Sequence, residues 1–145
     1  MYSPAQLAML KMNTVISVVD DDQSIRNSLR RLLRSTGFEV MIFPSALEFL
    51  YQGPLHKHGC VIVDVCMPEM DGLDLQKRLS DSGVSLPVVF MTAYENPGVR
   101  AHAMEAGALA FLQKPFSETS LMDAIWLALN SSQQFRGTKQ RIAEN

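Results

Sequence analysis

Five polar residues attract attention because each ends, or directly follows, a short apolar run: Asp20, Asp21, Asp64, Thr92 and Lys114. Three carboxylates gathered at one place repel one another and stay ionised only when a cation compensates their charge. Carboxylate oxygens suit Mg²⁺, which is commonly held by one or two of them together with a phosphate oxygen. A lysine and a hydroxyl at the same place could hold the other oxygens of a phosphoryl group in transfer. Asp64 is the only charged residue of its apolar run, so we expect it to be the nucleophile that forms an acyl phosphate.

Five strands are needed to position these residues. Short apolar runs alternate with helical patterns, and we expect strands at residues 15–19, 39–43, 60–65, 87–91 and 108–112. This alternation predicts a parallel sheet with helices on both faces, and near-continuous apolar strands are typical of such double burial. Open parallel sheets bind ligands beyond the carboxyl ends of their strands, where all five polar residues fall. The pattern therefore predicts an α/β fold with one shared site at that edge.

The composition indicates a single compact domain. The chain has 145 residues, of which 47% are hydrophobic and 19% are charged. Its net charge of −2 gives no general attraction to nucleic acid or to an anionic membrane. No apolar run approaches the about 18 residues of a membrane span, and residues 1–13 lack the pattern of a secretory signal. We divide the chain into an N-terminal extension (1–13), a domain (14–130), and a polar tail or start of a linker (131–145).

The two cysteines, Cys60 and Cys66, flank the third apolar run. We interpret both as buried strand residues, because a free cysteine packs as a small hydrophobe. Positions six apart on one extended strand cannot bring their sulfurs together, so we expect no disulfide between them. Reduced cysteines fit a cytoplasmic protein.

Each polar residue also has a simpler structural interpretation when it is taken alone. A run such as Asp20-Asp21-Asp22 is typical of a solvated helix start, where carboxylates favour the positive end of the helix dipole. We expect Asp22 to have only that role. A single aspartate after a strand is often a cap, and a threonine at a strand end is common. Their joint occurrence at matching strand ends is what favours a common site.

Four stretches of the chain resemble the receiver domain of two-component response regulators, the CheY-like superfamily. They are VISVVDDDQSIRNSLRRLL, CVIVDVCMPEMDGLDLQKRL, PVVFMTAYE and AMEAGALAFLQKPF. Together they cover nearly all of residues 14–130 in the order and spacing of that family. The last two stretches and the run of three aspartates are most similar to the FixJ-like branch of transcriptional regulators. The resemblance implies a flavodoxin-like (βα)5 doubly wound fold with a five-stranded parallel sheet in the order 2-1-3-4-5.

The resemblance also implies an acidic pocket with a phosphoryl acceptor. Asp64 would receive the phosphoryl group from a sensor histidine kinase. Asp21 and Asp64 would bind Mg²⁺ directly, with the backbone carbonyl of Cys66 as a third ligand. Asp20 would act on the ion largely through a bound water. The side chain of Cys66 lies where the family varies and where side chains modulate the phosphoryl lifetime.

Further roles follow from the same resemblance at the fourth and fifth strands. Lys114 would pair with phosphoryl oxygens, and Thr92 would move inward to hydrogen-bond them. Phe111 matches the aromatic switch position, although a core aromatic is the alternative interpretation. Tyr94 could shield the acyl phosphate from water, or it could be a surface tyrosine. The Lys114-Pro115 bond matches a family position with a cis peptide, which is credible because proline follows.

Phosphorylation would act by a population shift that changes the surface around residues 99–129. The family uses that surface for phosphorylation-dependent homodimers or for contact with an output domain, and the helix that carries Ile25 and Leu29 would dock the kinase. FixJ-like regulators carry a C-terminal helix-turn-helix domain that is not found in these residues, so we assign no nucleic-acid binding to them. We favour a receiver fragment of a transcriptional regulator, and a natural single-domain receiver is the alternative.

Two other classes of function are open. The first is an aspartate-nucleophile phosphohydrolase, in which Asp20 would be the nucleophile and Asp22 the acid/base two residues later. The position of Asp64 and the missing cap insertion speak against it. The second is a phosphate-independent interaction module, which we would expect to lack one of the acidic or lysine residues. We therefore expect a signalling domain rather than an enzyme.

Overall fold

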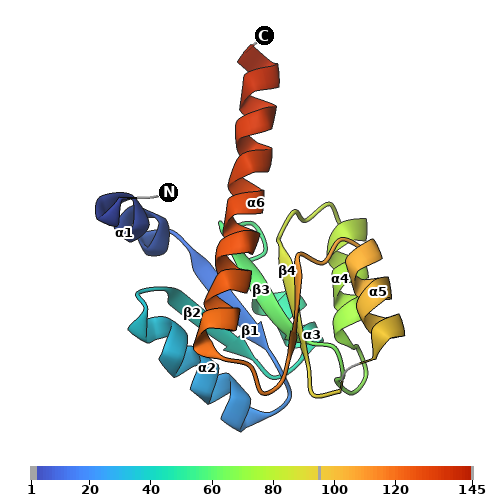
Figure 1. Cartoon of the computed structure of the whole chain (residues 1–145). Helices are drawn as coiled ribbons and strands as arrows, with labels where there is room; N and C mark the ends of the chain where they lie inside the picture. Colours follow the sequence, from blue (N-terminus) through green and yellow to red (C-terminus); the bar gives the residue numbers. More distant parts are fainter. Residues whose placement is uncertain (1–2, 95, 145) are drawn as a thin grey trace.

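The computed structural model describes residues 3–94 and 96–144, with the backbone alone at residues 7, 9, 10, 12 and 132–144. Helices and strands alternate along this part of the chain (Figure 1). In chain order they are α1 (Pro4–Met12), β1 (Val15–Val19), α2 (Gln23–Ser35), β2 (Glu39–Phe43), α3 (Ala46–Gln52), β3 (Gly59–Asp64), α4 (Gly72–Asp81), β4 (Val88–Thr92), α5 (Pro97–Glu105), β5 (Ala110–Gln113) and α6 (Glu118–Glu144). None of these helices is both long and apolar enough to cross a membrane.

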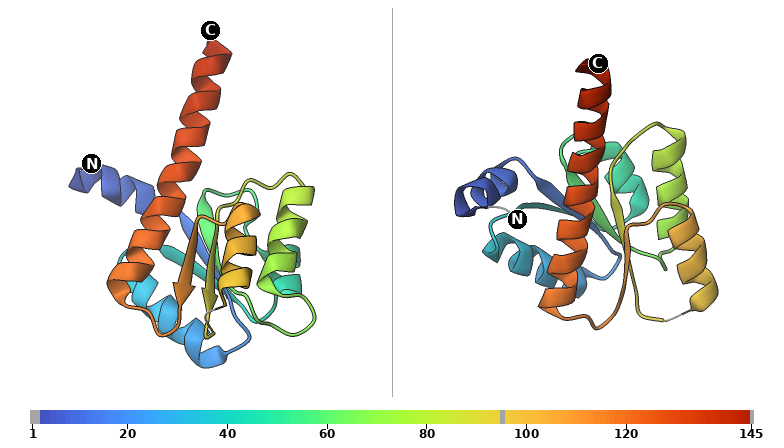
Figure 2. Two further views of the ribbon diagram at one scale, coloured as in Figure 1. Left: turned by 45° about the vertical axis from the view of Figure 1, so that its right-hand side comes forward. Right: turned by 45° about the horizontal axis from the view of Figure 1, so that its top comes forward.

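The five strands form one parallel sheet in the order β2-β1-β3-β4-β5. This order confirms the predicted flavodoxin-like α/β fold. Helices α2 and α6 cover one face of the sheet, and α3, α4 and α5 cover the other (Figures 1 and 2). Because all strands run the same way, their carboxyl ends meet at one edge, which is the lower edge in Figure 1.

The strands are buried because both faces of the sheet are packed. Every residue of β1 and of β3 is buried. Cys60 and Ile62 pack with α2 and α6, whereas Val61 and Val63 pack with the helices of the opposite face. Such double burial explains why the strands have no polar alternation in the sequence.

The ends of β3, β4 and β5 differ from those expected by one or two residues. Strand β3 ends at Asp64 rather than at residue 65. Strand β5 begins at Ala110 rather than at residue 108, because the preceding residues close helix α5. The amide of Ala108 donates to the carbonyl of Ala103 at 3.0 Å, and Gly107 takes a φ of 102°, which favours glycine.

The ends of the chain contain more helix than the sequence predicts. The N-terminal extension forms α1, which a capping box between Ser3 and Gln6 begins. The Nζ atom of Lys11 lies 5.7 Å from the ring centroid of Phe38, so this helix contacts the residue that precedes β2.

Residues 131–144, predicted as a polar tail or linker, continue α6 beyond the sheet (Figure 1). Glutamine, arginine and lysine are good helix formers, and no proline interrupts them. The division into extension, domain and tail stays a prediction.

The expectation of two buried cysteines is wrong for Cys66. Cys60 is buried in β3, but Cys66 is exposed because the chain leaves the sheet after Asp64. Both are free thiols. Burial raises the pKa of the Cys60 thiol to about 12, so this residue is both inaccessible and protonated at neutral pH.

This difference predicts unequal thiol reactivity. In the native protein at pH 8, Ellman's reagent should modify Cys66 alone, and in denaturant it should modify both thiols. The measurement is the number of thiol equivalents released before and after adding guanidinium chloride, with Cys66→Ser as the control. Two equivalents from native wild-type protein would contradict the burial of Cys60.

Candidate functional site

The carboxyl edge of the sheet brings together the residues predicted to share a site. Asp20 directly follows β1, Asp64 ends β3, and Thr92 ends β4. Lys114 directly follows β5, and its amide donates to the carbonyl of Thr92 at 2.7 Å, which extends the β4–β5 ladder by one bond. The register of the sheet therefore fixes where each of these side chains begins.

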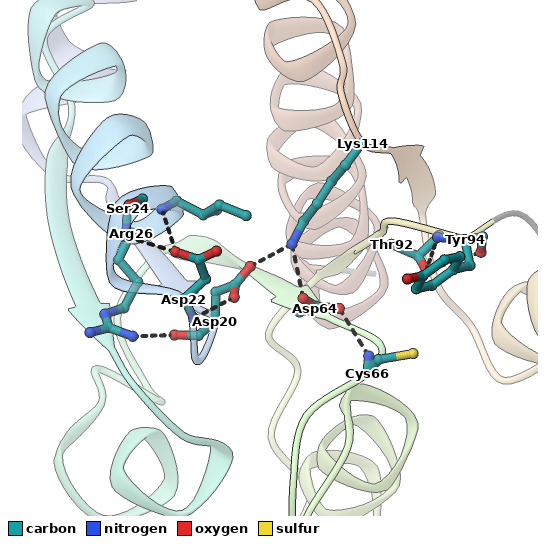
Figure 3. A network of polar contacts seen from close by, with 10 residues as sticks. Asp20, Asp22, Ser24, Arg26, Asp64, Cys66, Thr92, Tyr94 and Lys114 are labelled. Carbon is teal, nitrogen blue, oxygen red and sulfur yellow. Dashed lines mark hydrogen bonds and ion pairs between the residues drawn. The ribbon is translucent and has the colours of Figure 1, made fainter.

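One ammonium group joins two of these strands. Lys114 Nζ lies 2.8 Å from Asp20 Oδ2 and 2.9 Å from Asp64 Oδ2 (Figure 3). The side chains are 14%, 0% and 10% exposed, respectively, so both ion pairs are largely shielded from solvent. The Lys114-Pro115 peptide is cis, as predicted.

Burial and pairing act on the two titratable partners in opposite ways. Burial raises the pKa of Asp64, although hydrogen bonds from Lys114 and from the amide of Cys66 lower it. Burial by itself would lower the pKa of Lys114, but the hydrogen bonds to Asp20 and Asp64 outweigh it and raise that pKa. Lys114 is thus held as a cation, and a second cation would help to keep the carboxylates ionised.

The carboxylates of Asp20, Asp21 and Asp64 form a cluster that could hold a metal ion. One oxygen from each lies within 4.8 Å of the others. Opposite ligands of an octahedral Mg²⁺ are about 4.2 Å apart, so small side-chain shifts would suffice to bind the ion. Asp21 is exposed, whereas the other two are buried, so the cluster is open to solvent on one side. The donor set fits a hard divalent cation.

Backbone contacts orient the two buried carboxylates. Asp64 Oδ1 accepts a hydrogen bond from the amide of Cys66 at 2.9 Å. Asp20 Oδ1 accepts one from the amide of Asp22 at 2.9 Å. Asp22 itself is the N-cap of α2, and its carboxylate accepts a hydrogen bond from the amide of Ser24 at 2.8 Å. The predicted capping role of Asp22 is confirmed.

The hydroxyl of Thr92 has other partners than Asp64 in this structure. It donates to the carbonyl of Tyr94 at 3.1 Å and accepts from the amide of Tyr94 at 3.2 Å (Figure 3). The Tyr94 side chain is 79% exposed. Thr92 therefore lies at the predicted edge, with its hydroxyl engaged by the loop that follows β4.

The ring of Phe111 lies inside the domain. Its centroid is 6.2 Å from that of Phe90, and the guanidinium carbon of Arg100 lies 5.5 Å from the Phe111 centroid. Phe111 thus has the packing of a core aromatic in this structure, which is the alternative that the sequence leaves open.

Arg26 is a residue near the site to which the sequence assigns no role. Its Nη1 donates to the carbonyl oxygen of Asp20 at 2.6 Å (Figure 3). Its position one turn into α2, directly behind the aspartate run, is the only sequence feature that could have indicated this contact.

The geometry of this edge agrees with comparisons to known proteins. A sequence profile of the response regulator receiver domain matches residues 16–126. The chain belongs to the response regulator receiver family. This result confirms the resemblance on which the sequence interpretation relied, and identifies a signalling domain of two-component response regulators.

Relatives of this receiver domain include transcriptional regulators. Response regulator protein TmoT of Ectopseudomonas mendocina is 39% identical over 144 residues, which cover 97% of this chain and 66% of TmoT. Transcriptional regulatory protein FixJ of Bradyrhizobium diazoefficiens is 39% identical over 118 residues, which cover 81% of this chain and 58% of FixJ. The similarity to FixJ agrees with the predicted branch of the family.

Solved structures of response regulators have the same fold. StyR superposes with a TM-score of 0.81 at 41% identity, over 91% of this chain and 68% of StyR. The FixJ-N structure gives a TM-score of 0.76 at 33% identity, over 81% of this chain and 94% of FixJ-N. The receiver chain spans 66% of TmoT and 58% of FixJ, so these curated relatives are longer proteins.

Removing the shared ammonium should destabilise the domain. We expect Lys114→Met, measured without divalent ions at pH 7, to lower the free energy of unfolding by about 1–3 kcal/mol, because two buried carboxylates lose their partner. Burial of Asp64 is then no longer opposed by a cation, so its folded-state pKa rises further above the unfolded value. The folded variant takes up a proton at a higher pH than its unfolded chain does. The difference in unfolding free energy between wild type and Lys114→Met should therefore shrink as the pH falls.

The measurement is urea unfolding in EDTA at pH 7 and pH 5. The control is Lys77→Met, which removes the same charge from an exposed position on α4. A deficit that is equal at both pH values, or equal in the two variants, would contradict the role assigned to Lys114.

Proposed function

We propose that this receiver domain accepts a phosphoryl group on Asp64 from the phosphohistidine of a sensor histidine kinase. The observation that supports this proposal most directly is the ammonium of Lys114 bound to both Asp64 and Asp20 beside a third carboxylate. A carboxylate oxygen of Asp64 attacks phosphorus, the bond from phosphorus to the imidazole nitrogen breaks, and the histidine leaves with its electron pair.

The surrounding residues supply charge compensation and orientation in this proposal. Asp21, Asp64 and the backbone carbonyl of Cys66 would hold Mg²⁺, and Asp20 would act through a bound water. The ion would neutralise the charge of the transferred phosphoryl oxygens. Lys114 would release part of its contact with Asp64 and pair with a phosphoryl oxygen, since its ammonium already lies 2.9 Å from that carboxylate.

Thr92 would carry the phosphorylation state to the rest of the domain. Its hydroxyl would exchange the two contacts with Tyr94 for a phosphoryl oxygen. Movement of Thr92 at the end of β4 would shift the loop that follows and the packing of Phe111 on the neighbouring strand. The side chains of Cys66 and Tyr94, two residues after Asp64 and Thr92, would modulate the lifetime of the adduct. The result would be a changed surface on α5, β5 and α6.

The output of this switch is proposed to be transcriptional. Relatives such as FixJ are named as transcriptional regulators and are longer than this chain. The switched surface would form a homodimer or contact an output domain in a longer protein. We propose that the domain works in the cytoplasm with its kinase.

The capping role of Asp22 favours a phosphoryl acceptor over a phosphohydrolase. In a phosphohydrolase that used Asp20 as nucleophile, Asp22 would act as the acid/base. Here the Asp22 carboxylate accepts hydrogen bonds from the amides of Ser24 and Ile25 at the start of α2. Steady turnover of p-nitrophenyl phosphate by the purified chain would overturn this assignment.

Mg²⁺ should stabilise the domain through the cluster. We expect 10 mM MgCl₂ to raise the melting temperature of wild type by several degrees, because an ion bound only to the folded state stabilises it. Asp21→Asn should lose this increase. Asp22→Asn is a matched control, since it removes the same charge from the adjacent residue and asparagine still caps the helix. An equal response of both variants to Mg²⁺ would contradict the proposed ligand set.

Phosphorylation itself can be tested with a small-molecule donor. Acetyl phosphate and Mg²⁺ should add one phosphoryl group, seen as a single mass increase of about 80 Da. The adduct should be stable in acid and labile in base, as an acyl phosphate is. It should be absent in Asp64→Asn and in EDTA, and present in Asp71→Asn, which alters an N-cap outside the cluster. An adduct of equal yield in Asp64→Asn would assign the acceptor to another residue.

A further inference from the structure

We infer that Arg26 is a positioning residue for the metal-binding carboxylates. The β1–α2 loop consists of Asp20, Asp21 and Asp22, so it carries two members of the proposed cluster. Arg26 contacts this loop from the first turn of α2. The inference rests on the proposed Mg²⁺ site and concerns how this chain holds that site in shape.

The carbonyl of Asp20 needs a donor from outside the sheet. Pairing of β1 with β2 ends at Val19 and Phe43. The amide of Asp20 still donates to the carbonyl of Phe43 at 3.2 Å, but the carbonyl of Asp20 lies at the point where the chain turns toward α2. Asp20 is fully buried, and a buried carbonyl without a partner is costly. The guanidinium of Arg26 supplies this donor at 2.6 Å.

Arg26 holds the loop at two points. Its side chain bonds the carbonyl of Asp20, and its amide makes the first backbone bond of α2, to the carbonyl of Asp22 at 3.1 Å, which any residue at this position would keep. Asp21 is the residue between these two points, and it is the exposed member of the carboxylate cluster. The two contacts therefore limit how the peptides on either side of Asp21 can rotate, and with them the direction of its carboxylate.

The Arg26 guanidinium donates a hydrogen bond to a backbone carbonyl, whereas Lys114 forms ion pairs with the carboxylates themselves. A cation near the cluster has two opposite effects on Mg²⁺. Its charge repels the ion, while its hydrogen bond holds the ligands in place. The half-buried, short contact to a fixed backbone atom favours the second effect. The two effects predict opposite changes in affinity when Arg26 is replaced.

The test compares Arg26→Gln, Arg26→Lys and Arg30→Gln in the full chain, with Mg²⁺ binding measured by titration calorimetry. We expect Arg26→Gln to weaken Mg²⁺ binding by about 10-fold, as is typical when a residue that orients a metal ligand is removed. Arg26→Lys keeps a charged donor and should restore most of the affinity. Arg30→Gln is the matched control, because it removes the same charge one turn later, where Arg30 bonds Asn27 rather than the loop.

A second measurement uses no metal. Hydrogen exchange of the Asp22 amide, which donates to Asp20 Oδ1 at 2.9 Å, should be faster in metal-free Arg26→Gln than in wild type and Arg30→Gln. Unchanged or tighter Mg²⁺ binding by Arg26→Gln would overturn the inference, and so would an equal loss in Arg30→Gln. If Arg26→Gln does not fold, Arg26→Lys decides the question: faster exchange of its Asp22 amide together with wild-type Mg²⁺ affinity would overturn the inference, because a loosened loop should bind Mg²⁺ more weakly.

These outcomes are separate from those of the proposed function. Failure of wild type to form the Asp64 adduct would reject phosphoryl acceptance, yet metal binding and hydrogen exchange would still report on Arg26. Normal adduct formation in wild type with unchanged binding in Arg26→Gln would reject the positioning role alone.

Discussion

The arrangement of the site depends on one ammonium group that is shared by two carboxylates from non-adjacent segments of the chain. Lys114 follows the edge strand β5, whereas Asp20 directly follows the central strand β1 and Asp64 ends the central strand β3. The lysine side chain therefore crosses the end of β4 to reach them. Both partners are largely buried, so the ion pairs are screened little, and removing one partner would leave a buried charge uncompensated. The site holds together only when β1, β3 and β5 are in register.

That register comes from the apolar sheet below the site. Both faces of β1 and β3 are packed, so a shift of either strand by one residue would turn core side chains to the wrong face. The last residues of the strands are then fixed without any contribution from the site itself. This separation of tasks explains how a cluster of like charges is tolerated: the core supplies the stability that the carboxylates, with one lysine among them, do not.

The sequence predicts the fold and the membership of the site because both follow from strand ends. Apolar runs that end at Asp20 or within two residues of Asp64 place these residues at one edge, independently of how the side chains pack. The direction of a side chain is different, because it depends on partners far away in the sequence. The hydroxyl of Thr92 bonds the backbone of Tyr94, and Arg26 bonds a carbonyl behind the aspartate run. The exposure of Cys66 does not follow from the sequence, because a continuous apolar run gives no indication that the strand ends two residues earlier.

Helix α6 runs without a break from the functional edge of the sheet to a point beyond its opposite edge. It starts four residues after Lys114 and contains 27 residues, which at 1.5 Å per residue corresponds to about 40 Å. Buried residues such as Leu121 and Ile125 pack its first half against the sheet, and its second half extends beyond the sheet. A tilt of about 5° in the packed segment would displace the end of the helix, about 22 Å beyond Leu129, by about 2 Å. A rearrangement beside Lys114 that tilted the packed segment would therefore also move the opposite end of the domain.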